Sequence, residues 1–260
     1  MMSPADRQKA ASALRTAEET RKPMEQLSKT WPDIDFDDAY AIQDLVIKDK
    51  VAKGAKIIGY KIGLTSKAMQ ASSQINEPDY GHLLDTMLVP DGATVKHADY
   101  CAPRLEIELV FVLNKSLKGP GIGMMDVMRA TEYIVPSMEL VDARVQNPRK
   151  IFDTVADNAA AAGLVIGGRP IKPFDFDLRW VGGALYRNAD IEETGLALGV
   201  MGHPANGIAW LANRFGRHSI EIPAGQVLLS GSFIRAIWIN KGDTLHADFG
   251  PLGSLAVQYV

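Results

Sequence analysis

The chain has 260 residues, of which 47% are hydrophobic, and this suits one large domain or a main domain with a smaller appendage. The formal net charge of −3 gives no electrostatic reason to expect nucleic acid or an anionic membrane as a partner, and the single cysteine, Cys101, excludes an intrachain disulfide. Because there is no secretory signal pattern and no apolar run of the ~18 residues that span a bilayer, we expect a cytoplasmic protein.

Residues 1 to 55 carry the pattern of a helical region packed on the main body. Residues 3 to about 29 are polar and alanine-rich with scattered apolar positions, which predicts an amphipathic helix before a turn near Trp31. A second helix is predicted to begin near Asp35, because acidic side chains are favoured at the positive end of the helix dipole. Gly54 is a natural stop for that helix.

Residues 56 to 260 are expected to form a β-rich catalytic domain, which opens with a short strand at residues 57–64. Lys61 lies in this apolar strand between two glycines, where backbone can approach a ligand closely. Burial would lower the pKa of Lys61 and suit it to acid–base chemistry, whereas a surface lysine would extend its ammonium into water.

The next stretch predicts a short helix or ordered loop over residues 65–75 and a turn over residues 76–81. Asp79 lies in that turn. It is a candidate catalytic acid, although a turn aspartate more often caps its own backbone.

A buried strand is predicted over residues 103–113, and it carries Glu106 and Glu108 among apolar neighbours. Alternate side chains of a strand point to the same face, so these carboxylates lie roughly 7 Å apart on one side. Buried carboxylates repel each other and need a positive partner. With Glu139 from a second apolar strand, they would suit Mg²⁺ or Mn²⁺, which prefer oxygen ligands.

Two other interpretations of this acidic strand remain open at this point. Glu106 and Glu108 could form one solvated face of a half-exposed sheet, or they could pair with Arg104 and Arg144. Spacing alone does not decide between these arrangements and a metal site.

The rest of the chain is expected to be mainly β with helices interspersed. We expect helices from Asp126 to about Tyr133 and over residues 153–163, and a hairpin around Arg187–Asn188. His203 is expected to be a loop or capping residue. No dinucleotide-binding glycine motif, phosphate-binding loop or serine-hydrolase elbow occurs, so nothing indicates a nucleotide cofactor or a serine nucleophile.

Several short motifs, taken in order and spacing, resemble a known family over nearly the whole chain from about residue 36. The sequence is similar to the hydratase and decarboxylase group of the fumarylacetoacetate hydrolase superfamily, and the run at residues 65–75 is especially similar. The motifs are Tyr60–Ser66, Pro78–Gly81, Pro103-Arg104-x-Glu106-x-Glu108, Glu139, Asp157–Ala159 and Gly202–Pro204.

This resemblance implies an α+β fold, a mixed β-roll with surrounding helices and a helical N-terminal segment. It implies Mg²⁺ or Mn²⁺ held by Glu106, Glu108 and Glu139, with Lys61 and Asp79 in the acid–base role. It also implies a symmetric homo-oligomer, with decamers known in the group, and no nucleic-acid or membrane partner.

The implied activity is addition of water to a 2-oxo-3-enoate, with the seven-carbon 2-oxo-hept-3-ene-1,7-dioate as the expected substrate in aromatic catabolism. Arg235, together with Ser232 in the same turn, is assigned to substrate binding, with Arg235 meeting the distal carboxylate. Hydration of 2-hydroxypenta-2,4-dienoate and decarboxylation of 4-oxalocrotonate remain alternatives, because one metal site could serve all three reactions. A non-catalytic partner subunit is less consistent with a complete set of acids and Lys61.

Overall fold

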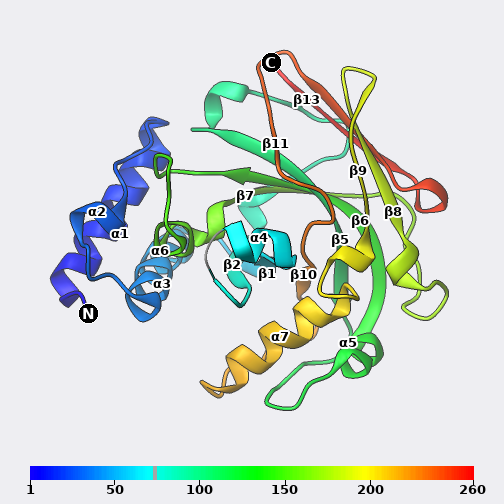
Figure 1. Ribbon diagram of the computed structural model, residues 1–260, viewed down its shortest axis with the longest axis horizontal. Coiled ribbons are helices and arrows are strands. Elements are labelled where there is room, and N and C mark those ends of the chain that lie inside the picture. The colour runs from blue at the N-terminus through cyan, green and yellow to red at the C-terminus, as the bar shows by residue number, and fades with distance from the viewer. Residues whose placement is uncertain (73–74) are drawn as a thin grey trace.

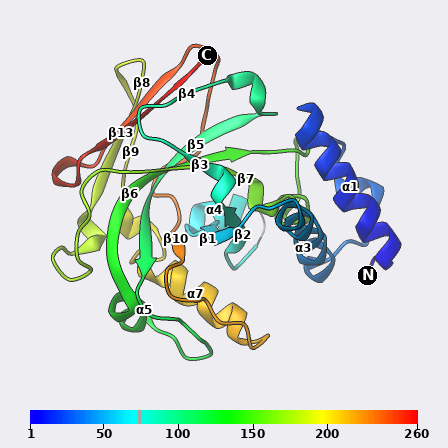
Figure 2. The ribbon, with the colours of Figure 1, turned by 180° about the vertical axis from the view of Figure 1, so that it is seen from behind.

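The protein is described by a computed structural model that covers residues 1–72 and 75–260. It combines helices with two curled β-sheets, so the predicted α+β class is confirmed (Figure 1). Figures 1 and 2 both show α1 and α3 at one end of the molecule and β8, β9 and β13 at the other. In the described ranges, no helix is long and apolar enough to cross a membrane.

The helices are short apart from two near the N-terminus. The α-helices are α1 (Pro4–Thr20), α2 (Leu27–Thr30), α3 (Phe36–Ala52), α4 (Lys67–Ser72), α5 (Met124–Ala130), α6 (Ile151–Ala156) and α7 (Ala205–Gly216). Single 3₁₀ turns are η1 (Asp85–Met87), η2 (His97–Asp99), η3 (Asn158–Ala160), η4 (Leu178–Trp180), η5 (Ala197–Gly199) and η6 (Gly250–Leu252).

The strands divide between a larger sheet that carries the candidate site and a smaller one. The larger sheet contains β1 (Ile57–Gly63), β2 (Asp79–Leu84), β3 (Leu88–Val89), β5 (Pro103–Leu113), β6 (Thr131–Asp142), β7 (Ala161–Ile166), β10 (Val227–Leu229) and β11 (Ile237–Trp238). The smaller sheet contains β4 (Thr94–Val95), β8 (Gly182–Arg187), β9 (Asp190–Leu196), β12 (Thr244–Asp248) and β13 (Ser254–Tyr259).

Two long strands, β5 and β6, form the spine of the larger sheet, whose order is β2-β1-β10-β5-β6-β7-β3 with β11 paired to β5. One face of β5 packs into the main core through residues such as Ile107 and Phe111. The other face packs Val110 against Leu229 and Leu164 in a smaller apolar cluster. Both faces of β5 are therefore covered, which matches its strongly apolar sequence.

The N-terminal helices begin where the sequence predicts. Ser3 caps α1 by accepting from the Asp6 amide at 3.1 Å, and Asp35 caps α3 by accepting from the Asp38 amide at 2.8 Å. Asp38 itself is buried and accepts from Arg7, which joins the two helices. These helices form an apolar cluster of their own that also takes in residues of α6.

Four local predictions are wrong. The helix expected over residues 3 to about 29 ends at Thr20, where Arg21 takes a left-handed conformation with a φ of 57°. The expected turn at residues 76–81 becomes strand from Asp79, because β2 pairs with β1 from the Asp79–Gly63 position onward. The helix expected over residues 153–163 ends at Ala156, because residues 158–160 have φ of 53°, 50° and 58° and cannot continue a right-handed helix. The helix expected to reach Tyr133 ends at Ala130, where β6 takes over to pair with β5.

Two further predictions have different outcomes. The hairpin around Arg187–Asn188 is confirmed, because β8 and β9 pair across it. The expected helix or loop over residues 65–75 contains α4, and Ser73 and Gln74 within that run lie outside the described residues.

A buried histidine connects β2 to α3 and to the left-handed segment at residues 158–160. The His82 ring Nδ1 lies 3.1 Å from Gln43 Oε1. The side-chain nitrogen of Gln43 donates to the carbonyls of Tyr80 and Val155. Asn158 closes the arrangement by accepting from the His82 amide and donating to its carbonyl. Burial lowers the pKa of His82 from 6.5 to about 4, so the ring is neutral in the folded protein.

His82 predicts a loss of stability in mild acid. Because the unfolded chain takes up this proton more readily than the folded chain, the contribution of neutral His82 is complete above about pH 6.5 and is lost as the pH falls towards 4. The free energy of unfolding falls by at most about 1.4 kcal/mol per pH unit for one proton. Urea denaturation of the wild type and His82→Gln at several pH values measures it. An equally steep pH dependence in both proteins would contradict the assignment.

Candidate active site

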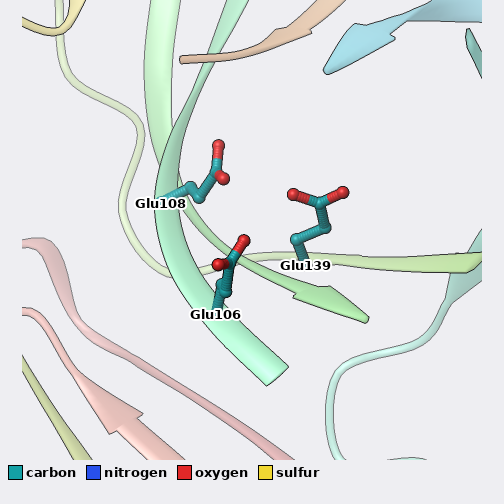
Figure 3. A group of neighbouring side chains, drawn as sticks. All are labelled: Glu106, Glu108 and Glu139. Carbon is teal, nitrogen blue, oxygen red and sulfur yellow. The ribbon is translucent and has the colours of Figure 1, made fainter. Parts of the chain in front are cut away.

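The pairing of β5 with β6 brings the three predicted acids together. Glu106 lies directly opposite Glu139, and Glu108 lies directly opposite Ser137. Because alternate residues of a strand share a face, all four side chains point to the same side of the sheet. Figure 3 shows the carboxylates of Glu106, Glu108 and Glu139 converging on one space.

The carboxylates lie closer together than unshielded acids should. One oxygen from each of Glu106, Glu108 and Glu139 lies within 4.8 Å of the others, and the last two side chains are fully buried. Burial, and next the charge of Glu139, raises the pKa of Glu106 to about 7 and raises that of Glu108 well above its usual value. The ionised form of these carboxylates is therefore destabilised by burial and by their mutual repulsion.

The hydrogen bonding of these acids is incomplete in the described part of the chain. Oε1 of Glu108 and both carboxylate oxygens of Glu139 are buried without a hydrogen-bond partner. Such oxygens are costly to bury unless a cation or donor meets them. Three convergent carboxylates with free oxygens fit a hard divalent cation such as Mg²⁺ or Mn²⁺, and leave coordination positions for other ligands.

Lys61 on β1 forms an ion pair with this group. Its Nζ lies 3.3 Å from Glu139 Oε1, without the geometry of a hydrogen bond, and donates to the Ala159 carbonyl at 3.3 Å. Burial on its own would lower the pKa of Lys61, but the charges of Glu139 and Asp79 outweigh it and raise the pKa above the ordinary value. Of the two positions that the sequence leaves open for Lys61, the structure shows the buried one, and neighbouring acids raise a pKa that burial alone would lower.

Asp79 faces Lys61 across a glycine. A methyl group added to Gly63 would lie 2.2 Å from Asp79 Oδ1 and 3.2 Å from Lys61 Nζ, so only glycine leaves both side chains their place. Asp79 Oδ1 is buried and has no hydrogen-bond partner among the described residues. Burial raises the pKa of Asp79, and Lys61 opposes that shift. A buried lysine and a buried aspartate therefore border the three carboxylates.

A backbone turn completes the side of the site next to β10. That strand ends at Leu229, and the Gly231 amide then donates to Glu108 Oε2 at 2.8 Å. Gly231 has a φ of 114°, a conformation open to glycine and strained for other residues. Sequence reasoning missed this donor, since no side chain signals it.

Two serine hydroxyls were also missed by sequence reasoning. Ser137 Oγ and Ser230 Oγ are buried without a partner in the regions described. Ser137 could have been found, because it lies two residues before Glu139 and so shares its face of β6.

The two alternative interpretations of the acidic strand are wrong. The carboxylates do not form a solvated face, because Glu108 and Glu139 are fully buried. Arg144 pairs with Asp157 instead, its Nε 2.6 Å from Oδ1, and Arg104 lies over the Trp238 ring at 4.7 Å. Neither forms an ion pair with the acids in the described ranges.

His203 behaves as the sequence predicts. Its ring Nδ1 accepts from the Ala205 amide at 3.1 Å, at the start of α7. The capping role is therefore confirmed.

The two predicted substrate-binding residues line a cavity of about 320 Å³ that reaches Glu106. Ser232 Oγ lies within a local turn, 2.9 Å from the Ile234 carbonyl. Arg235 is 69% exposed at its side chain and pairs with Glu193. A second cavity of about 240 Å³ also reaches Glu106, on the side of Lys61 and Asp79.

Comparison with known proteins places this geometry in context. No family model matches the chain. The chain is 50% identical over 96% of its length to the 2-oxo-hept-4-ene-1,7-dioate hydratase of Escherichia coli, of which it covers 96%.

Solved structures agree with this relationship. The chain is similar to 4-oxalocrotonate decarboxylase from Pseudomonas putida G7, complexed with magnesium and adipate, with a TM-score of 0.97 at 32% identity over 100% of this chain and 99% of that one. It shares the fold of fumarylpyruvate hydrolase from Pseudomonas aeruginosa, complexed with Mn²⁺ and pyruvate, with a TM-score of 0.59 at 13% identity over 77% and 88% of the two chains.

The predicted resemblance and fold are thus confirmed by sequence identity over nearly the full length and by the TM-score of 0.97 over the whole chain. The chain belongs to the hydratase and decarboxylase family of the fumarylacetoacetate hydrolase superfamily.

Proposed function

We propose that this protein is a divalent-metal-dependent hydratase that converts 2-oxo-hept-3-ene-1,7-dioate, or its 2-hydroxy-2,4-diene tautomer, into 4-hydroxy-2-oxoheptanedioate. The observation that carries the proposal is the group of unpartnered carboxylate oxygens beside Lys61 and Asp79. The 50% identity to a hydratase of a seven-carbon diacid supports this substrate over shorter ones.

Glu106, Glu108 and Glu139 are the residues that would hold Mg²⁺ or Mn²⁺. When bound, such a cation supplies Lewis-acid polarisation of the substrate's 2-oxo group. The Gly231 amide fixes Glu108, and the opposed strands fix Glu106 and Glu139, so the three ligands keep one geometry. A rigid ligand set reduces the rearrangement that binding requires.

Lys61 and Asp79 move the protons of the reaction in this proposal. The diene tautomer loses its 2-hydroxyl proton and gains a proton at C5, which gives the 3-ene. Water then adds its oxygen to C4, and a proton is delivered to C3, so one water molecule is consumed. Both groups are buried and border the acids, so each lies where it can exchange protons with a substrate held there, at C3 or C5.

The proposed function predicts a clear substrate preference. Purified protein with Mg²⁺ should hydrate the seven-carbon dienedioate, seen as loss of its conjugated ultraviolet absorbance, with 4-hydroxy-2-oxoheptanedioate as product. Removal of metal by a chelator should abolish the activity, and Mg²⁺ or Mn²⁺ should restore it. Stronger activity on 2-hydroxypenta-2,4-dienoate, or release of CO₂ from 4-oxalocrotonate, would move the protein to a sister activity of the family.

Two variants on the same strand provide the matched control for the metal ligands. Glu139→Gln should weaken Mg²⁺ binding by about 100-fold or more, measured by calorimetry, because it removes one of three charged ligands. Glu132→Gln changes an exposed acid of β6 and should bind Mg²⁺ as the wild type does. Equal Mg²⁺ binding by both variants would exclude Glu139 as a metal ligand.

A separate outcome concerns the wild type. If the metal-loaded protein is inactive on all three substrates, the result would favour a non-catalytic partner subunit.

Replacement of Lys61 tests the acid–base role separately from metal binding. Lys61→Met should lower kcat by roughly 100-fold or more, the usual contribution of a positioned acid or base, while the Kd for Mg²⁺ changes by only a few fold. Lys172→Met, at an exposed lysine paired with Glu132, is the matched control. A kcat for Lys61→Met within a few fold of the wild type would exclude the role.

The homo-oligomer, of up to ten subunits, is part of the same proposal. Phe174 and Trp180 expose 61% and 62% of their surfaces, which is unusual for large aromatic side chains unless another surface covers them. Light scattering during size-exclusion chromatography should give a mass several times the 28.3 kDa of one chain. A mass of one chain at micromolar concentration would contradict the proposal.

A further inference from the structure

The cavity next to Lys61 carries two arginines that form no ion pair within the described residues. Arg104 and Arg149 line it together with Lys61, Asp79 and Glu106. Arg104 Nε and Arg149 Nη1 are buried without a hydrogen-bond partner, and neither side chain forms an ion pair with any residue the structure describes. Arginine donors are normally paired when they leave water, so these two nitrogens are suited to an anionic ligand.

The rest of the cavity wall supports an anionic ligand. Arg104 is held in place by the Trp238 ring, 4.7 Å from its guanidinium carbon, so its orientation is fixed from the β11 side. Arg104 and Arg149 line the same cavity, and burial, and next the charge of Arg104, lowers the pKa of Arg149. A carboxylate between them would relieve the repulsion between their charges and satisfy both donors.

The cavity also has the right extent for a diacid that reaches the metal ligands. It measures about 240 Å³, and both Glu106 and Arg149 line it, together with Asn147 and Thr154. A seven-carbon keto-diacid has 12 non-hydrogen atoms and fits such a volume. One end of the molecule would lie at Glu106 and the other at the arginines.

Resting on the proposed function, we infer that Arg149, assisted by Arg104, binds the distal carboxylate of the substrate and sets the preference for a diacid. Arg235 is the competing candidate. It pairs with Glu193 and is largely exposed, so a substrate carboxylate would have to displace an acid already in place. Arg104 and Arg149 form no ion pair in the residues described, and each has one buried nitrogen without a hydrogen-bond partner.

The test compares Arg149→Gln with Arg235→Gln on the seven-carbon dienedioate and the five-carbon dienoate. Arg149→Gln should lower kcat/KM for the diacid by about 30-fold or more and change that for the monoacid by less than about 3-fold. Arg149→Lys should recover part of the loss, because it restores the charge without the planar fork. Arg235→Gln should keep the diacid preference.

A binding measurement separates this inference from the catalytic proposal. Calorimetry with Mg²⁺-loaded protein and unreactive heptanedioate should show binding that Arg149→Gln weakens by a similar factor, whereas hexanoate should be affected little. This readout stands even if neither dienoate is hydrated.

Three results would overturn the inference. An unchanged diacid preference in Arg149→Gln would remove the residue from the distal site. Equal losses with both substrates would place the arginine at the carboxylate shared by both molecules. Loss of preference in Arg235→Gln alone would assign the distal carboxylate to the other cavity.

Discussion

The repulsion among three close carboxylates, two of them fully buried, is the constraint on which the rest of this structure depends. Glu106, Glu108 and Glu139 occupy one face of two adjoining strands, where neighbouring apolar residues exclude water. Such charges persist inside a protein only when fixed positive groups or a metal ion meet them. The chain itself supplies too little positive charge, because Lys61 is the one cation that forms an ion pair with any of these acids in the described regions.

A left-handed backbone segment at residues 158–160 positions Lys61 beside these acids. Asn158, Ala159 and Ala160 adopt three successive left-handed conformations, each costing on the order of 1 kcal/mol outside glycine. The buried Arg144–Asp157 pair and the bonds between Asn158 and His82 hold this segment in place. Its conformation presents the Ala159 carbonyl to Lys61. Contacts outside the site therefore help to fix the ammonium of Lys61 beside Glu139.

The sequence predicted the acids well and the surrounding groups poorly, for a physical reason. Alternation along a strand is local, so the shared face of Glu106 and Glu108 follows from spacing alone. The contact of Lys61 with Glu139 depends on how a curled sheet brings β1 towards β6, which no local pattern encodes. The early end of the helix at Ala156 has the same origin, since tertiary hydrogen bonds override the helical preference of an alanine-rich run.

A single set of metal ligands can serve addition of water or loss of CO₂, because both reactions stabilise negative charge on the same 2-oxo group. The choice between them, and between long and short substrates, must therefore depend on the cavity walls beyond the acids. Here one wall presents two arginines that form no ion pair in the described chain, and the other presents an arginine already paired with Glu193. An anion gains most where buried donors have no partner, and this asymmetry favours the wall of Arg104 and Arg149 for the second carboxylate.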